Sequence, residues 1–124
     1  MEKKKILIVD DEPEFVELMK VRLGASDYAV QALSDAREVS EAAASIKPDL
    51  ILLDIVMPGI DGYEVCRLQE KDRKTAAIQV ILLTGKDIDP QATYKKCREL
   101  GIAGFVSKPV NSTELLAKIK SAIK

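Results

Sequence analysis

Ile6-Leu7-Ile8-Val9-Asp10-Asp11-Glu12-Pro13 is the most informative segment of this 124-residue chain, because it joins an apolar run to three acids and a proline. Apolar side chains at four successive positions are typical of a strand covered on both faces, as in a parallel sheet between two layers of helices. Proline suits the first position of a helix. The segment therefore predicts a central parallel strand, an acidic turn and then a helix.

Four similar apolar runs follow, at residues 28–33, 50–53, 79–83 and 104–106. Between the runs the apolar residues recur with a helical period. This predicts helices from residue 13, from behind Asp35 through residue 46, at 62–71 and 90–100, and from residue 112. Five alternating β–α units predict an α/β fold, (βα)5, with a doubly wound sheet of five parallel strands. A barrel would need eight units.

Two helix starts carry a specific signal. Asp35 is followed three residues later by Glu38, and Asn111 is followed three residues later by Glu114. This spacing is typical of a capping box, in which the first side chain accepts a hydrogen bond from the backbone N–H three residues on.

The composition excludes several kinds of chemistry. The chain has no histidine, which rules out serine and cysteine triads and histidine metal sites. Its net charge of −1 argues against a direct nucleic-acid partner. The two cysteines, Cys66 and Cys97, are too few for a zinc site or a disulfide framework and are expected in the core. With no signal peptide and no apolar run near the ~20 residues that span a bilayer, we expect a cytoplasmic protein without a membrane partner.

Polar residues stand at four of the five expected strand ends, where ligands bind in an open α/β sheet. They are Asp10-Asp11-Glu12, Asp54, Thr84-Gly85 and Ser107-Lys108. Crowded acids repel one another, and a hard divalent cation with oxygen ligands relieves the repulsion. Mg²⁺ is the expected ion, with Mn²⁺ as an alternative. Without histidine or a catalytic cysteine, the plausible nucleophile is a carboxylate, which would form an aspartyl phosphate.

Taken together, these motifs resemble the receiver (REC) domain of two-component response regulators over residues 5–124. The resemblance is carried by the segment quoted first and by Pro48-Asp49 through Asp54, Met57-Pro58-Gly59, Asp61-Gly62, Leu83-Thr84-Gly85, Gly101, Gly104-Phe105 and Lys108-Pro109. It implies a flavodoxin-like receiver fold with strand order 2-1-3-4-5 and a single receiver domain over residues 1–124.

The resemblance also implies a role for each site residue. Asp54 matches the phosphoacceptor. Asp10 and Asp11 match the acidic pair that holds Mg²⁺ with Asp54 and the backbone carbonyl of Val56. The groups expected to contact the phosphoryl oxygens are the side chains of Thr84 and Lys108 and the backbone N–H groups of Val56 and Gly85. Phe105 matches an aromatic switch position, and the Lys108–Pro109 peptide bond is expected to be cis.

The implied switch links the phosphoacceptor to one face of the domain. A phosphoryl group on Asp54 would draw the Thr84 hydroxyl inward, and Phe105 would rotate into the vacated space. The face formed by residues 90–100, 104–106 and the last helix would then change shape. An output domain or a downstream protein is the expected partner there.

The phosphoryl donor must be another molecule, since receivers take phosphate from a phosphohistidine and this chain has no histidine. We expect a sensor histidine kinase or a histidine phosphotransfer protein, with a small phosphodonor as a further option. The chain would be no enzyme, because it catalyses only its own phosphorylation and dephosphorylation. We expect a monomer, with a phosphorylation-dependent dimer as an alternative. Both a single-domain receiver and a piece of a longer regulator remain open.

Three other functions match parts of the pattern less well. The main alternative is an aspartate-nucleophile phosphatase of the haloacid dehalogenase type, which uses an Asp-x-Asp pair after its first strand, whereas the acids here are adjacent. A flavodoxin-like FMN carrier should have a Ser/Thr/Gly phosphate loop where this chain has three acids. An interaction module with an inactive site fits poorly with site positions that are all chemically competent. Val56 and Lys86 offer no group that would activate a hydrolytic water, which predicts a long-lived aspartyl phosphate.

Overall fold

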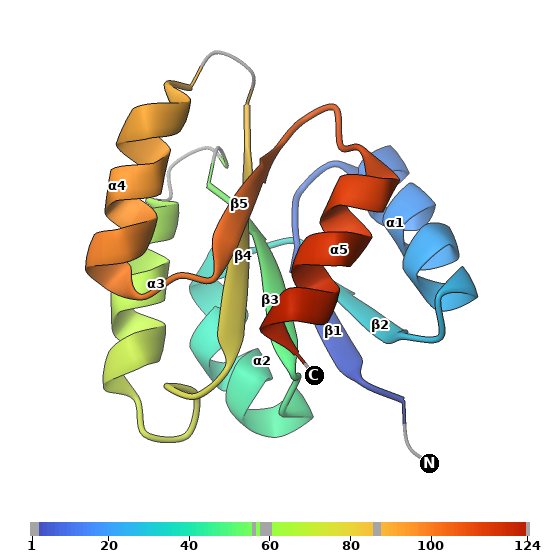
Figure 1. Ribbon diagram of the computed structural model, residues 1–124. Helices are drawn as coiled ribbons and strands as arrows, with labels where there is room; N and C mark the ends of the chain where they lie inside the picture. Colours follow the sequence, from blue (N-terminus) through green and yellow to red (C-terminus); the bar gives the residue numbers. More distant parts are fainter. Residues whose placement is uncertain (1–2, 56, 58–60, 86–87, 124) are drawn as a thin grey trace.

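Five strands alternate with helices along the chain, as the sequence predicts (Figure 1). The computed structural model describes residues 3–55, 57, 61–85 and 88–123. The elements are β1 Lys5–Val9, α1 Pro13–Ala25, β2 Ala29–Leu33, a 3₁₀ helix at Ala36–Glu38, α2 Val39–Ile46, β3 Leu50–Asp54, α3 Gly62–Lys71, β4 Gln79–Thr84, α4 Pro90–Leu100, β5 Gly104–Ser107 and α5 Ser112–Ala122.

The sheet has the strand order β2-β1-β3-β4-β5, and every neighbouring pair is parallel. This confirms the predicted order of a flavodoxin-like doubly wound fold. The chain reverses its direction of winding between β1 and β3, and ligands of such folds bind outside the carboxyl ends of the strands at this switch point. Asp10 follows β1 directly and Asp54 ends β3, so the topology alone brings these two acids to one edge.

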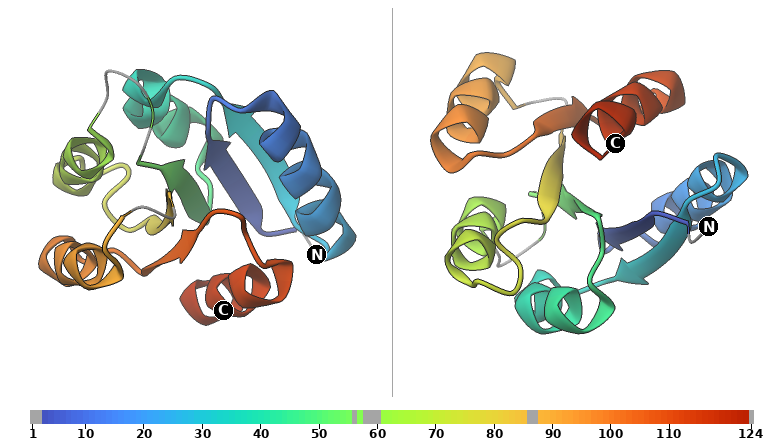
Figure 2. Two further views of the ribbon diagram at one scale, coloured as in Figure 1. Left: turned by 90° about the horizontal axis from the view of Figure 1, so that it is seen from above. Right: turned by 60° about the horizontal axis from the view of Figure 1, so that its bottom comes forward.

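Alternate side chains of the strands feed two separate apolar cores. One core lies between the sheet and α2, α3 and α4, and it includes Leu7, Leu53 and Leu82. The other lies between the sheet and α1 and α5, and it includes Ile8 and Leu52. Figure 2 shows the same two layers of helices on opposite sides of the sheet. Burial on both faces explains why β1, β3 and β4 are apolar at nearly every position.

Three strands run one residue further than the sequence predicts. β3 ends at Asp54, β4 at Thr84 and β5 at Ser107, because the parallel ladder continues through the pairs Asp54 with Leu83 and Thr84 with Ser107. The polar residues of the carboxyl edge are therefore held by sheet pairing. β2, at the edge of the sheet, begins at Ala29, one residue later than predicted.

One of the two predicted capping boxes is correct. The Asn111 side chain accepts the Glu114 N–H at 3.0 Å and starts α5. The Asp35 side chain instead accepts the N–H of Arg37 at 2.9 Å and caps the 3₁₀ helix, so that α2 starts only at Val39. The Asp35 carboxylate also pairs with the Arg37 guanidinium at 2.9 Å, which favours the tighter turn.

Gly62 brings the start of α3 close to the residue after Asp54. A Cβ atom at position 62 would lie 2.6 Å from Ile55 Cγ2 and 2.8 Å from Ile55 Cα. Such distances are shorter than any side chain tolerates, so this close approach requires glycine. Within the described residues, no helix is both long and apolar enough to cross a membrane.

Candidate functional site

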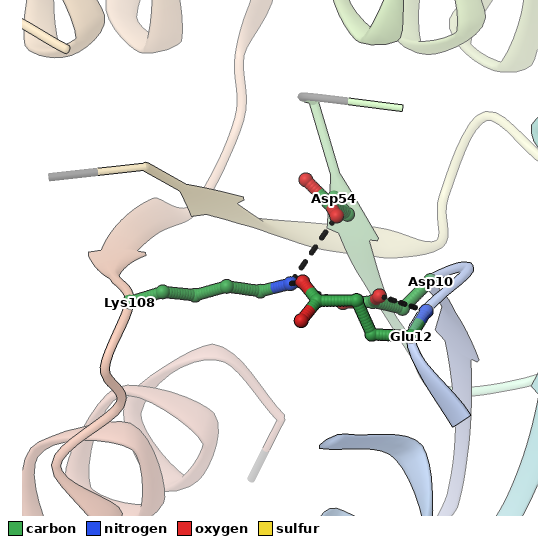
Figure 3. A network of polar contacts seen from close by, with 4 residues as sticks. All are labelled: Asp10, Glu12, Asp54 and Lys108. Carbon is green, nitrogen blue, oxygen red and sulfur yellow. Dashed lines mark hydrogen bonds and ion pairs between the residues drawn. The ribbon is translucent and has the colours of Figure 1, made fainter. Parts of the chain in front are cut away.

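The Lys108 ammonium lies among three carboxylates at the carboxyl edge of the sheet (Figure 3). Its Nζ is 2.6 Å from Glu12 Oε1, 2.7 Å from Asp10 Oδ2 and 3.2 Å from Asp54 Oδ2. The four residues come from the turn after β1, the end of β3 and the residue after β5. Segments far apart in the sequence thus form one charged network.

Backbone hydrogen bonds fix the places of these side chains. The Asp10 N–H donates to the carbonyl of Leu33 at 3.0 Å, and the Lys108 N–H donates to the carbonyl of Thr84 at 2.8 Å. The Glu12 N–H donates to Asp10 Oδ1 at 2.9 Å. The first two contacts tie Asp10 and Lys108 to the ends of the neighbouring strands β2 and β4, and the third fixes the turn after β1.

Burial and charge shift the pKa values of the network. Burial raises the pKa of the Asp10 carboxyl above its ordinary value, although contact with Lys108 and with the Glu12 N–H opposes this shift. For Lys108, burial alone would lower the pKa, but the carboxylates of Asp10, Glu12 and Asp54 outweigh it and raise the pKa. The ammonium therefore stays protonated at neutral pH.

The three carboxylates suit a hard cation. One oxygen each of Asp10, Glu12 and Asp54 lies within 4.8 Å of the other two. Asp10 Oδ2 is buried, and no described residue makes a hydrogen bond of normal geometry to it; the Lys108 ammonium 2.7 Å away forms an ion pair with it. A buried anionic oxygen beside two further carboxylates is the kind of donor set that Mg²⁺ binds. The residues therefore fit the expected metal.

The match to known proteins decides the family. The family model described as the response regulator receiver domain matches residues 6–120. The chain belongs to this family.

Two relatives of this receiver domain are considerably longer proteins. Response regulator PleD of Caulobacter vibrioides is 37% identical over 117 residues, which cover 94% of this chain and 25% of that protein. The alkaline phosphatase synthesis transcriptional regulatory protein PhoP of Bacillus subtilis is 37% identical over 121 residues, covering 98% of this chain and 49% of that protein. The receiver domain thus spans half the length of these relatives or less.

A solved structure agrees with the assignment. The signal receiver domain of a signal transduction histidine kinase from Syntrophus aciditrophicus is 33% identical, with a TM-score of 0.82 over 96% of this chain and 89% of that chain. Receiver domains of response regulators belong to two-component systems and interact with histidine kinases.

The structure places the predicted acids of the receiver domain unequally. Asp10 and Asp54 lie in the network, but Asp11 is exposed and is not among the carboxylates that lie close together. Glu12 is the third carboxylate of the network instead of Asp11. The sequence places Glu12 at the same rim, in the acidic run, but it does not show which side chains of that run point into the site. Val56, expected to supply backbone groups, is outside the described residues.

Thr84 and Gly85 lie at the end of β4, as predicted. The Thr84 side chain is 2% exposed, and its hydroxyl lies 3.3 Å from the hydroxyl of Ser107. The sequence places Ser107 at the same rim but does not predict its contact with Thr84, which follows from the pairing of the two residues across the ladder.

Phe105 lies one strand further on, half-buried against the core of α2, α3 and α4. A groove of about 740 Å³ opens beside it, lined by residues of α4, β5 and α5 that include Tyr94, Arg98 and Lys118. The groove lies on the face that the family resemblance expects to change.

Two smaller expectations are confirmed. The Lys108–Pro109 peptide bond is cis. Cys66 and Cys97 are buried free cysteines. Burial raises the pKa of the Cys66 thiol to about 12 and also raises the pKa of the Cys97 thiol. Both thiols therefore stay protonated, and the two cysteines pack in the core and do not act as nucleophiles.

Proposed function

We propose that this single receiver domain, residues 1–124, accepts a phosphoryl group on Asp54. The donor would be a phosphohistidine of a sensor histidine kinase or a histidine phosphotransfer protein. The observation that carries the proposal is the Asp54 carboxylate itself, which is 5% exposed at the end of a central strand with the Lys108 ammonium 3.2 Å from Oδ2. A carboxylate beside an ammonium at a sheet switch point is suited to phosphoryl transfer.

In the proposed reaction a carboxylate oxygen of Asp54 forms a bond to phosphorus as the phosphorus–nitrogen bond to the donor imidazole breaks. The imidazole nitrogen keeps the electron pair of the broken bond. The Lys108 ammonium can donate hydrogen bonds to the transferred oxygens, and the Thr84 hydroxyl and the Gly85 N–H are further donors at the same edge. Little covalent chemistry is asked of the protein, because positioning and charge supply most of the catalysis.

A divalent cation belongs to the same proposal. Mg²⁺, or Mn²⁺ in its place, would be held by Asp10 and Asp54, with Asp11 and the Val56 carbonyl as the further ligands implied by the family. When bound, it neutralises the carboxylates and the incoming phosphoryl oxygens. The fit of the acidic residues to a hard cation supports this assignment.

The switch is proposed to run through Thr84 and Phe105. A dianionic group on Asp54 would attract the Thr84 hydroxyl away from Ser107, and Phe105 would turn toward the vacated space. Phenylalanine has no hydroxyl to desolvate, which favours its inward position. The α4–β5–α5 face would then bind an output domain or a downstream protein, with a phosphorylation-dependent dimer as one outcome.

The haloacid dehalogenase alternative is not retained, since the chain belongs to the receiver family and its candidate nucleophile ends β3 rather than β1. Receiver domains are signalling domains rather than classical enzymes. We propose that the only reactions catalysed here are the phosphorylation and dephosphorylation of Asp54.

Intact-mass analysis tests the acceptor. Wild-type protein is incubated with Mg²⁺ and either acetyl phosphate or a phosphorylated histidine phosphotransfer domain, beside the variants Asp54→Asn and Asp49→Asn. Asp49 is a matched control, since it directly precedes the amino end of β3, whereas Asp54 lies at the carboxyl end of the same strand. We expect the mass of one phosphoryl group on the wild type and on Asp49→Asn, and none on Asp54→Asn.

Two results would overturn the assignment. An adduct that survives in Asp54→Asn would move the acceptor to another residue. Failure of the wild type to accept phosphate from both kinds of donor, with Mg²⁺ present, would show that the site is not a phosphoacceptor.

A further inference from the structure

We propose that Glu12 is a positioning residue for Lys108. It would hold the ammonium at the outer edge of the site and so let a cation take the inner carboxylates, Asp10 and Asp54. This inference rests on the proposed function and adds a residue to it. The family pattern assigns Glu12 no role.

The first observation is that Lys108 occupies the place of a cation. The three carboxylates that lie close enough to share one ion are the same three that contact the Lys108 ammonium. A divalent cation placed among these carboxylates would repel the ammonium at such short distances. Cation binding at Asp10 and Asp54 would therefore favour movement of the ammonium away from those two residues.

The second observation is that Glu12 differs from its two neighbours in exposure. The side chains of Asp10 and Asp54 are 0% and 5% exposed, whereas that of Glu12 is 62% exposed. The Glu12 backbone is nevertheless fixed, because its N–H donates to Asp10 and its carbonyl accepts the Val16 N–H at 3.1 Å. Glu12 thus carries an exposed carboxylate on an anchored backbone, which leaves the side chain room to follow the ammonium outward.

The third observation is a second contact on the outer side. The Lys108 ammonium lies 4.4 Å from the centre of the Phe15 ring, within the range of a cation–π interaction. Phe15 is in the first turn of α1, three residues after Glu12. Glu12 and Phe15 together offer the displaced ammonium an anion and an aromatic face close to the phosphoacceptor.

The consequence is a coupling between Glu12 and Lys108 in cation binding. In the wild type the ammonium gives up two carboxylates, and its contact with Glu12 strengthens because the ammonium is no longer shared with Asp10 and Asp54. In Glu12→Gln no anion compensates in this way, so displacement costs more. The loss of cation affinity in Glu12→Gln should therefore require Lys108.

A double-mutant cycle tests this coupling. Mg²⁺ alone is titrated into the unphosphorylated 124-residue protein and followed by calorimetry and by amide chemical shifts. The variants are Glu12→Gln, Lys108→Met, the double variant and Glu12→Asp. Glu14→Gln is the matched control, since it removes the same charge from an exposed position two residues on. Urea unfolding of each variant checks that it is folded.

We expect Glu12→Gln to weaken Mg²⁺ binding by about three- to tenfold when Lys108 is present and by less than about twofold in the Lys108→Met background. Lys108→Met alone should strengthen binding, Glu12→Asp should restore part of the affinity, and Glu14→Gln should change nothing. An equal or larger loss in the Lys108→Met background would mean that Glu12 acts on the cation directly and would overturn the proposal. So would an unchanged affinity in Glu12→Gln, or a wild type that binds no Mg²⁺. Phosphoryl acceptance by Asp54 is measured separately, so the two proposals can fail independently.

Discussion

The Lys118 ammonium donates a hydrogen bond of 2.6 Å to the backbone carbonyl of Phe105 and lies 5.4 Å from the centre of the Phe105 ring. Lys118 also pairs with Glu114 one turn earlier in α5, at 3.3 Å. Through these contacts α5 holds both the backbone and the ring of the residue at the expected switch position. The position of Phe105 therefore depends on a side chain from another element.

We predict that Lys118→Met loosens Phe105 without phosphorylation, because it removes the donor to the carbonyl and the cation near the ring. The chain has two phenylalanines, so protein labelled with fluorophenylalanine gives two ¹⁹F signals. The signal of Phe105 should shift or broaden, while that of Phe15, at the other end of the site, should stay in place. Lys120→Met is the control on the same helix. An unchanged Phe105 signal in Lys118→Met would show that the contact does not restrain the ring.

We predict opposite effects on stability for two glycine substitutions. Gly62→Ala should lower the free energy of unfolding by about 1–3 kcal/mol, because its Cβ would collide with Ile55. Gly24→Ala, in the last turn of α1 with nothing within 4 Å of the added atom, should raise it by about 0.4–1 kcal/mol. Urea unfolding of both variants measures the difference. A neutral Gly62→Ala would mean that Ile55 yields easily.

We predict that Asp10→Asn is more stable than the wild type at pH 7 when no divalent cation is present. Burial raises the pKa of Asp10, so between its ordinary value of 3.8 and the raised value the folded protein binds more protons than the unfolded chain. The free energy of unfolding of the wild type therefore falls as the pH rises through this window. Melting temperatures should show a gap between variant and wild type that shrinks as the pH is lowered toward 4.

Asp35→Asn serves as a control for that pH dependence. Hydrogen bonding to Arg37 lowers the pKa of Asp35, so its contribution to stability is present at neutral pH and is lost on acidification. Any effect of Asp35→Asn should thus have the opposite sign to that of Asp10→Asn. If the Asp10→Asn gap is the same at every pH, ionisation of Asp10 is not its cause.

We predict that the aspartyl phosphate is long-lived, because the Val56 side chain cannot hydrogen-bond the attacking water and a charged Lys86 cannot deprotonate it. Val56→Asn supplies an amide that can hydrogen-bond this water and should shorten the lifetime. Mass spectrometry after removal of the donor gives the decay of the phosphorylated form. A wild-type half-life of seconds would contradict the prediction.

Much of the fold follows from local patterns in the sequence. The apolar runs at β1, β3 and β4 predict buried parallel strands because burial on both faces leaves few positions for polar side chains. The predicted strand ends fall one residue short, since a polar residue such as Thr84 looks like the start of a loop until its partner in the ladder is known. The capping box predicted for Asp35 and Glu38 does not form, because Asp35 pairs with Arg37, two residues on, instead.

The site could be predicted as a set of residues but not as a set of contacts. Asp10, Asp54 and Lys108 meet because three parallel strands end at one edge, which the order of elements already implies. The direction of each acid in the run after β1 depends on the turn into α1, and here it is Glu12 that faces Lys108 while Asp11 faces solvent. The contact of Lys118 with Phe105 depends on how α5 packs, which no local pattern records.

The division of the interior into two cores has a consequence for how such a domain can diversify. Among the described residues, the two clusters have no member in common. Phe105 and Ile55 pack on the side of α2, α3 and α4, whereas α1 and α5 bury their side chains on the other. The sheet therefore acts as a partition between two modules. Mutations can remodel the buried face of α1 over evolutionary time while the apolar packing of Phe105 against the α2, α3 and α4 core is inherited unchanged.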